Sequence, residues 1–317
     1  MNRNNQILSA ILLIQLILLG LVFWPGSTTS RGGQEALLGE FDSTAVVALT
    51  ISDTDDNQSE LAKNGGNWVL ASADDYPADD SKITPLLDKL KEIKSNRLVT
   101  KTDSSHGRLK VADDDFERLV ELRLQDGTTH KLYVGTSGGP SATHIRHEGQ
   151  SEVYLTGELS MWDVNPQASS WIDTLYVTLP QTATLALKLE NQNGTFEFVK
   201  EGENWTMQGL AENETFKAST LTSMLDQITS LRMSSPIGKS KDPSFGLDAP
   251  RAVVTLQTTE GERILQIGAQ QADGNDSVVK WSESEYYVHI SNGTANNFAD
   301  KTRDEFLELP PTPVPEG

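Results

Sequence analysis

Two stretches of the chain share one helical pattern of apolar residues. Residues 81–94 read SKITPLLDKLKEIK, and residues 219–232 read STLTSMLDQITSLR. Their apolar residues follow the spacing of one face of an amphipathic helix. The matched apolar positions are Ile83, Leu86, Leu87, Leu90 and Ile93 in the first stretch and Leu221, Met224, Leu225, Ile228 and Leu231 in the second. Ser81 and Ser219 are the expected N-caps, with Pro85 as an alternative start of the first helix.

Alternating apolar and polar residues predict two similar hairpins after these helices. Residues 119–135 read LVELRLQDGTTHKLYVG, and residues 253–268 read VVTLQTTEGERILQIG. An Asp-Gly or Glu-Gly pair stands between the two alternating runs of each stretch, which is typical of a tight β-turn. Gly135 and Gly268 are expected to end the second strand. Further short strands are predicted at His144–His147, Val153–Leu155, Val279–Trp281 and Tyr286–Ile290.

The repeated order of elements predicts an α+β fold made of two tandem repeats. Each repeat is expected to contain an antiparallel sheet with one amphipathic helix on one face. The first repeat is placed at 40–175 and the second at 176–309, with Trp171-Ile172-Asp173 leading directly from one to the other. Residues 310–317, PPTPVPEG, are expected to be a proline-rich disordered tail.

The beginning of the chain predicts a membrane anchor. The run Ile7–Trp24 carries no charge and is long enough to cross a bilayer as a helix. Pro25-Gly26 would end that helix, and the small-x-small cleavage site of a secretory signal peptide is missing. We therefore expect residues 1–26 to be an uncleaved transmembrane signal anchor and 27–39 a flexible tether. The expected placement is a bacterial inner membrane, with most of the chain in the periplasm.

Composition narrows the possible partners and chemistry. The formal net charge of −19 repels phosphate backbones, so we expect no nucleic-acid partner. An acidic surface usually serves solubility, and attraction to a cationic partner is the alternative. The chain has no cysteine, which excludes disulfides and thiolate catalysis.

One serine lies in a motif that hydrolases use. Residues 135–139, GTSGG, place Ser137 in a G-x-S-x-G pattern. A nucleophile elbow requires a helix after the serine, but Pro140 and a strand-like stretch follow. The matching residues 268–271 contain no serine. We expect a glycine-rich loop here and no catalytic residue.

Metal-ligand patterns are also incomplete. His144, His147 and Glu148 lack the H-E-x-x-H spacing of zinc proteases, and on a strand the two histidines would face opposite sides. Asp53, Asp55 and Asn57 begin like a calcium loop, which then lacks its required glycine and final glutamate. Further acidic clusters are Asp74-Asp75, Asp79-Asp80 and Asp113–Asp115. Solvated turns are the expected interpretation of these residues, and no metal or cofactor is expected.

Several short motifs resemble the family known as domain of unknown function 4340. They are Asn67-Trp68, Tyr76-Pro77-Ala78-Asp79, Lys82-Ile83, Asn204-Trp205, Phe245-Gly246-Leu247-Asp248-Ala249-Pro250 and Ile264–Gly268. The first repeat departs from the pattern at His106-Gly107-Arg108. The recurrence of Trp68 and Trp205 in strand-like segments predicts two core anchors.

The resemblance implies a role beside a transporter. Similar proteins commonly have one N-terminal span and are often encoded beside ABC-type export components, such as those of gliding motility. The family has no established reaction, so no catalytic residue is implied. The leading hypothesis is a non-enzymatic accessory or scaffold protein bound to ABC transporter permease or auxiliary subunits. The alternatives are a polysaccharide- or peptide-binding module and, third, a hydrolase.

Overall fold

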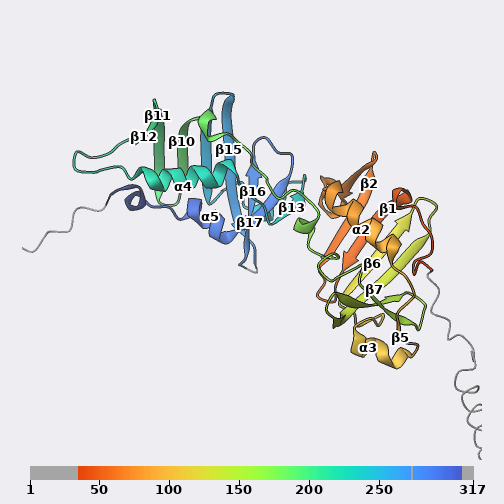
Figure 1. The fold of residues 1–317 in the computed structure, drawn as a ribbon. Helices are drawn as coiled ribbons and strands as arrows, with labels where there is room; N and C mark the ends of the chain where they lie inside the picture. Colours follow the sequence, from red (N-terminus) through yellow and green to blue (C-terminus); the bar gives the residue numbers. More distant parts are fainter. Residues whose placement is uncertain (1–34, 273, 309–317) are drawn as a thin grey trace, which may run out of the picture.

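The first half of the chain forms one antiparallel sheet, shown at the right of Figure 1. The computed structural model describes residues 35–272 and 274–308. The strand order of this first sheet is β4-β3-β2-β1-β6-β7-β8-β9-β5. The strands are β1 (Val46–Ser52), β2 (Gln58–Asn64), β3 (Asn67–Leu70), β4 (Tyr76–Pro77), β5 (Leu98–Thr100), β6 (Arg118–Leu124), β7 (Thr129–Gly139), β8 (Ala142–His147) and β9 (Val153–Thr156). We call this sheet and its helices the first unit.

The second half repeats the arrangement in a sheet of order β12-β11-β10-β14-β15-β16-β17-β13. The strands are β10 (Thr184–Asn191), β11 (Gly194–Glu201), β12 (Asn204–Met207), β13 (Ser235–Gly238), β14 (Ala252–Thr258), β15 (Gly261–Gln270), β16 (Asp276–Trp281) and β17 (Tyr287–Ser291). This second unit has the connectivity of the first, apart from the extra strand β4. Two mainly antiparallel sheets with few helices confirm the α+β prediction.

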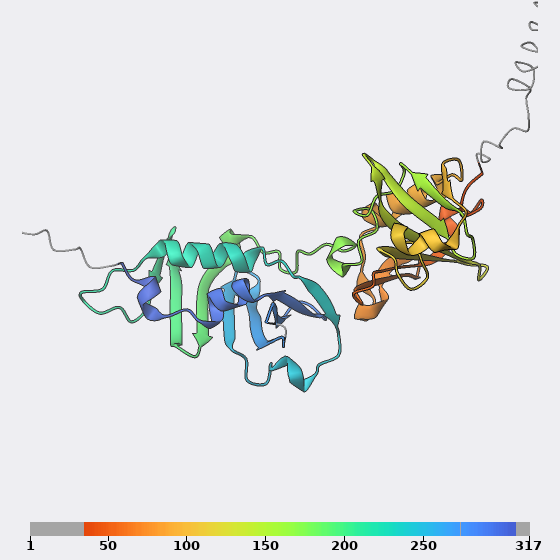
Figure 2. The ribbon, with the colours of Figure 1, turned by 90° about the horizontal axis from the view of Figure 1, so that it is seen from below.

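The two predicted helices cover one face of their own sheets (Figures 1 and 2). They are α2 (Asp80–Glu92) and α4 (Ala218–Thr229), and every predicted apolar stripe position is buried. The structure adds the short α3 (His106–Leu109) in the first unit and α5 (Asn292–Ala299) in the second.

The predicted helix starts are wrong. Asp79 is the N-cap of α2, where its side chain accepts a hydrogen bond from the Ser81 backbone N–H (3.0 Å). Lys217 occupies the N-cap position of α4 without a side-chain cap. Both N-caps are held from outside the helix, because their backbone N–H groups donate to the carbonyl oxygens of Trp171 and Phe306 (2.7 and 2.8 Å). Pro85 lies inside α2 on an exposed position.

Gly135 and Gly268 do not end their strands but lie inside β7 and β15. A Cβ atom on Gly135 would come within 2.1 Å of the Leu109 carbonyl oxygen, and one on Gly268 within 2.1 Å of the Phe245 carbonyl oxygen. In each unit, the segment that precedes the hairpin therefore crosses over the sheet at the glycine. It lies so close to the strand that no side chain fits between the segment and the strand. The glycines mark this crossing, which strand periodicity does not reveal.

Each unit has its own core, and the chain passes directly between them. Trp171 is buried in the first core and the next residue, Ile172, in the second. The prediction of a flexible tether over residues 27–39 is wrong at its end, because Leu37 and Leu38 are buried in the first core. The Leu37 backbone N–H donates to Ile93, as that of Tyr176 donates to Leu231 in the second unit (both 2.8 Å). The repeat thus begins before residue 40.

A joint of polar and aromatic contacts connects the two units. The Asp74 carboxylate accepts a hydrogen bond from the Lys239 backbone N–H (2.6 Å), and the Tyr286 hydroxyl donates to the Asp75 carbonyl (3.0 Å). The rings of Tyr76 and Tyr286 meet edge to face at 4.7 Å. Burial, together with the neighbouring Tyr176, raises the pKa of Tyr76 to about 12. The segment 71–77 of the first unit therefore covers the edge of the second sheet at β13.

The predicted span Ile7–Trp24 and the tail 310–317 lie outside the described residues. Between residues 35 and 308, position 273 excepted, no helix has the length and apolar character needed to cross a bilayer. The same limits apply to most of the tether, of which only 35–39 is described.

Candidate functional site

The segment after β9 differs in local structure from its counterpart after β17. In the second unit, the strand β17 is followed by α5, whose Phe298 and Ala299 are buried in the core. In the first unit, residues 157–167 form turns and contain no helix. Trp162 of this segment is 88% exposed. Because buried tryptophans supply much of the contact energy at protein interfaces, an indole this exposed is a candidate contact residue.

The turn that carries Trp162 is tightly held. Residues 160–163, the Trp162 turn, close with a backbone hydrogen bond from Asp163 to Ser160 (3.1 Å). The Asp163 carboxylate accepts hydrogen bonds from the Ser160 backbone (2.8 Å) and hydroxyl (2.6 Å), and from the Lys89 ammonium group (2.5 Å). Burial opposes ionisation of Asp163, but these hydrogen bonds outweigh it and hold its pKa below the usual value. The indole is therefore presented by a pre-organised turn.

Two hollows flank the Trp162 turn. One of about 550 Å³ lies toward the β7–β8 hairpin, and its lining includes Ser137, Thr143 and Glu158. The other, of about 210 Å³, lies along α2. Lys89, Trp162 and Asp163 line both hollows, so the turn forms the ridge between them.

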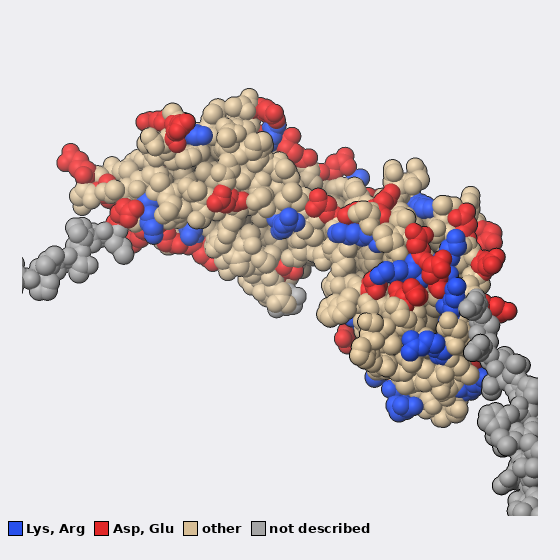
Figure 3. Space-filling view, in the orientation of Figure 1, with Lys and Arg blue, Asp and Glu red and all other residues tan. Residues whose placement is uncertain are grey.

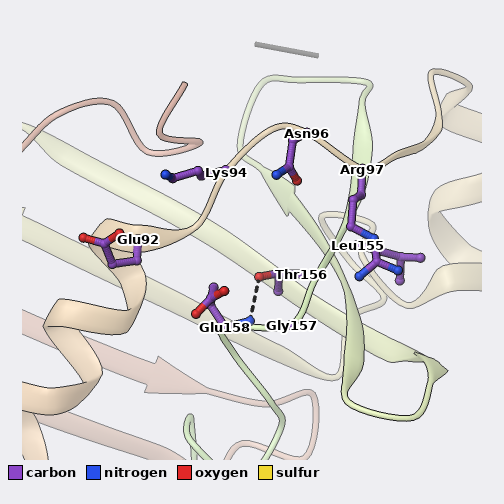
Figure 4. A pocket seen from close by; sticks show the side chains of 8 residues that line it. All are labelled: Glu92, Lys94, Asn96, Arg97, Leu155, Thr156, Gly157 and Glu158. Atoms are coloured by element: carbon purple, nitrogen blue, oxygen red, sulfur yellow. Dashed lines mark hydrogen bonds between the residues drawn. The ribbon is translucent and has the colours of Figure 1, made fainter. Parts of the chain in front are cut away.

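A third hollow continues the same surface toward β5. It has a volume of about 350 Å³, and it shares Gly157 and Glu158 with the larger hollow beside Trp162. Figure 4 shows the loop after α2, with Lys94 and Arg97, arching over the turn at 156–158. The Glu158 backbone N–H donates to the Thr156 hydroxyl (3.1 Å) and shapes this turn. Charged and hydroxyl groups lie beside apolar groups such as Leu86, Leu159 and Met161 in these hollows, so they can make both polar and apolar contacts around an aromatic anchor.

Ser137 belongs to a hairpin and not to a nucleophile elbow. It lies near the end of β7, and β8 follows after a two-residue turn. Its hydroxyl donates to the backbone carbonyls of Gly139 (3.0 Å) and Ala142 (3.4 Å). His144 instead contacts Thr136, through its Nδ1 and the Thr136 carbonyl (2.8 Å). The structure therefore gives Ser137 no helix after it and places the nearby histidine on another partner.

The two histidines of β8 point to opposite faces of the sheet, as predicted for a strand. His144 contacts Thr136 on one face, while the His147 ring lies 6.0 Å from that of His130 on the other. Among the described residues, no three histidine, aspartate or glutamate side chains converge into a possible metal site.

The acidic clusters have structural partners. Asp53 accepts hydrogen bonds from the backbone N–H groups of Asp55 (3.0 Å) and Asn57 (3.1 Å), which closes the β1–β2 turn. Asp113 pairs with the buried guanidinium group of Arg146, and this hydrogen bond holds the pKa of Asp113 below its usual value.

The predicted core role is confirmed for Trp68, which is buried in the first core. Trp205 packs against the second core but remains partly exposed. Sequence reasoning missed Trp162, because no apolar period surrounds it. The available signal was a tryptophan inside a Ser-x-x-Asp turn, at the point where the two repeats stop resembling each other.

The chain belongs to the family of proteins that contain the domain of unknown function DUF4340. The family model described as Domain of unknown function (DUF4340) matches residues 68–244, from β3 of the first unit into the segment before β14 of the second. The predicted resemblance is therefore confirmed. Neither a curated protein nor a solved structure matches the chain.

Proposed function

We propose that this protein is a membrane-anchored, extracytoplasmic accessory or scaffold protein of an ABC-type export system. In this proposal it acts by binding a protein partner and performs no reaction of its own. The anchor is the apolar run Ile7–Trp24, and the association with a transporter follows from the family resemblance. The expected partners are permease or auxiliary subunits in the same membrane.

The observation that carries the binding role is the presentation of Trp162. An indole that protrudes from a rigid turn loses little conformational entropy on binding, and tryptophan is enriched among residues that dominate interface energy. The hollows on both sides have mixed polar and apolar linings, so they can accept hydrogen-bonding and apolar groups of the partner around this anchor. A convex tryptophan between two hollows fits a pocket on another protein.

The same tryptophan supports a second candidate, a polysaccharide-binding module. Sugar rings stack on exposed aromatic faces, and serine, threonine and carboxylate groups line the adjoining hollow. Because Trp162 forms a ridge and not the floor of a cleft, we rank this function second.

The test is co-purification of the full-length protein from detergent-solubilised membranes. We expect transporter subunits with the native chain and a loss of roughly tenfold or more with Trp162→Ala, as for a hot-spot residue. Leu185→Ala is the matched control, because Leu185 is an exposed apolar residue of the second unit. Capture should also weaken at high salt, because salt screens the attraction between opposite charges of the two proteins.

Two outcomes would contradict the proposal. One is equal recovery of membrane partners with Trp162→Ala and the native chain. The other is turnover of an ester, peptide or glycoside by the purified protein that disappears in Ser137→Ala. Retention on a polysaccharide column that depends on Trp162, without any co-purified protein, would favour the second candidate.

A further inference from the structure

The equivalent edges of the two sheets differ in what covers them. β13 is the last strand of the second sheet, and the segment 71–77 of the first unit lies against it. β5 is the last strand of the first sheet, and within the described residues no further strand pairs with it. Leu98 and Val99 of β5 are 47% and 40% exposed, whereas Pro236 of β13 is buried. An uncovered edge strand with apolar side chains is a template for pairing with another chain.

The two edges are equivalent residue by residue. β5 pairs with β9, and β13 pairs with β17. Both pairs show the same irregularity, between Leu98 and Thr100 and between Pro236 and Gly238. Thr100 therefore corresponds to Gly238, and Lys101 to Lys239.

The β5 edge lies where the chain enters from its N-terminal end. The first described residue, Glu35, accepts a hydrogen bond from the Ser95 backbone (3.1 Å), three positions before Leu98. The stretch 25–34 separates Glu35 from the proposed membrane span and reaches at most about 35 Å when fully extended. An anchored chain would thus hold this edge close to the bilayer, within reach of the extracytoplasmic segments of membrane proteins.

The charges beside β5 disfavour a second copy of this chain. Two β5 strands paired antiparallel about Val99 would place Arg97 of one copy opposite Lys101 of the other, twice. Like charges directly opposite each other destabilise a strand pair. Figure 3 shows that the charged side chains over α3 and β5 are mostly basic on this face, in a chain that is acidic overall. A partner strand with carboxylates at these positions would be attracted instead.

The joint shows how an acidic segment lies against the equivalent edge of the second sheet. There the covering segment carries Asp74 and Asp75 before Tyr76, and Asp74 accepts the Lys239 backbone N–H. That close approach depends on Gly238, because a Cβ there would come within 2.6 Å of the Asp74 carboxylate. Thr100 stands at this place in β5 and excludes an equally close loop. A partner at the ordinary spacing of paired strands remains compatible with Thr100.

We propose that the β5 edge binds an extended, acidic and apolar segment of a membrane protein, which adds to the first sheet as a further strand. This inference rests on the proposed function and assigns it a second contact region. The hollow beside Trp162 and the hollow toward β5 share Gly157 and Glu158 in their linings. The Trp162 turn and the β5 edge therefore belong to one face of the first unit. Backbone pairing would supply affinity, and Arg97 and Lys101 would select acidic partners.

Site-specific photocrosslinking in isolated membranes tests the proposal. Because the chain has no cysteine, full-length Val99→Cys can be labelled at one position with benzophenone maleimide. Val199→Cys is the matched control, since Val199 is 37% exposed on β11 of the second unit. We expect irradiation to join the label at position 99 to a membrane protein, and no such adduct from position 199. Adding Arg97→Glu should lower the yield roughly fivefold.

The outcomes separate this inference from the proposed function. If the native chain co-purifies transporter subunits but position 99 gives no adduct, the β5 proposal alone is overturned. If the native chain captures no membrane protein, both fail. An adduct between two copies, strengthened by Arg97→Glu, would identify a homodimer edge and overturn the assigned partner. Lys101→Glu provides the same charge test if Arg97→Glu lowers the melting temperature.

Discussion

The two units have equivalent but separate cores, and they differ at their surfaces. α2 and α4 bury equivalent stripes, and Gly135 and Gly268 allow the same close crossing. By contrast, β13 is covered where β5 is open, and α5 occupies the place of the Trp162 turn. The features that both units repeat maintain the fold, while the Trp162 turn and the open β5 edge, found only in the first unit, are the proposed contact regions.

The largest expected effect concerns the shared helix stripe. Leu87→Asp and Leu225→Asp should each destabilise their own unit by about 4 kcal/mol, because an unpaired charge enters a core. Denaturant unfolding of the purified protein measures this loss. Thr84→Asp and Ser223→Asp, at exposed positions of the same helices, should have little effect. If the buried and the exposed variants were equally stable, the claim that both units bury an equivalent helix stripe would be contradicted.

The shared glycines come next. Gly135→Ala and Gly268→Ala should each cost about 3 kcal/mol, since the added methyl group collides with a backbone carbonyl that cannot move freely. Gly107→Ala is the control, because its Cβ would lie 3.8 Å from the nearest contact, the Asp115 carboxylate. Thermal melts in which all three variants behave alike would show that the crossing is looser than described.

The joint covers the β13 edge, whereas the β5 edge has no such cover among the described residues. A substitution in the joint can weaken the contact between the units without changing either core. Gly238 has a φ of 143°, and an added Cβ would meet Asp74. Gly238→Ala should weaken the contact between the units by about 2 kcal/mol while leaving both cores intact. Unfolding of this variant, monitored by tryptophan fluorescence, should then show two separate transitions. The native chain should show a single, more cooperative transition. An unchanged curve would mean that the joint does not couple the units.

The smallest expected effect is a pH dependence confined to the first unit. Burial, followed by the nearby His130, lowers the pKa of His147 below 6.5. The unfolded state therefore binds the proton more readily, and stability should fall as the pH drops from about 6.5 toward the folded pKa. Below that pKa no further change is expected from this residue. The equivalent position in β16 is Trp281, which does not titrate.

A pH series of denaturant midpoints for native protein and His147→Gln checks this expectation. The variant should flatten the dependence by less than about 1 kcal/mol, because the imidazole is partly solvated. A decline near pH 6 that persists in the variant would assign the effect to another group.

Local patterns in the sequence predicted most of the fold. The stripe from Ile83 to Ile93 and the hairpin at 119–135 follow from periodicity alone, because each buries one face of a regular element. Helix starts were missed because α2 is capped by Asp79 and held by Trp171, a contact across many residues. The role of Gly135 depends on a chain crossing that has no local signature.

The candidate site was not predictable in the same way. Trp162 became conspicuous only through its exposure, which depends on how the described part of the chain folds around the turn and not on its local sequence. The openness of β5 likewise follows from the order of strands in the sheet, not from residues 98–100 themselves. Polar motifs such as the one around Ser137 attracted attention because they resemble known chemistry, whereas their contacts are structural.

Hydrogen exchange tests most directly whether the first unit is the binding unit. The full-length protein alone would be compared with its complex recovered from detergent-solubilised membranes, and amide protection would be followed by mass spectrometry. We expect slower exchange in the complex at residues 95–101 and 157–165, with little change at the counterparts 235–239 and 292–299. Protection confined to the second unit, or absent from the first, would contradict this expectation.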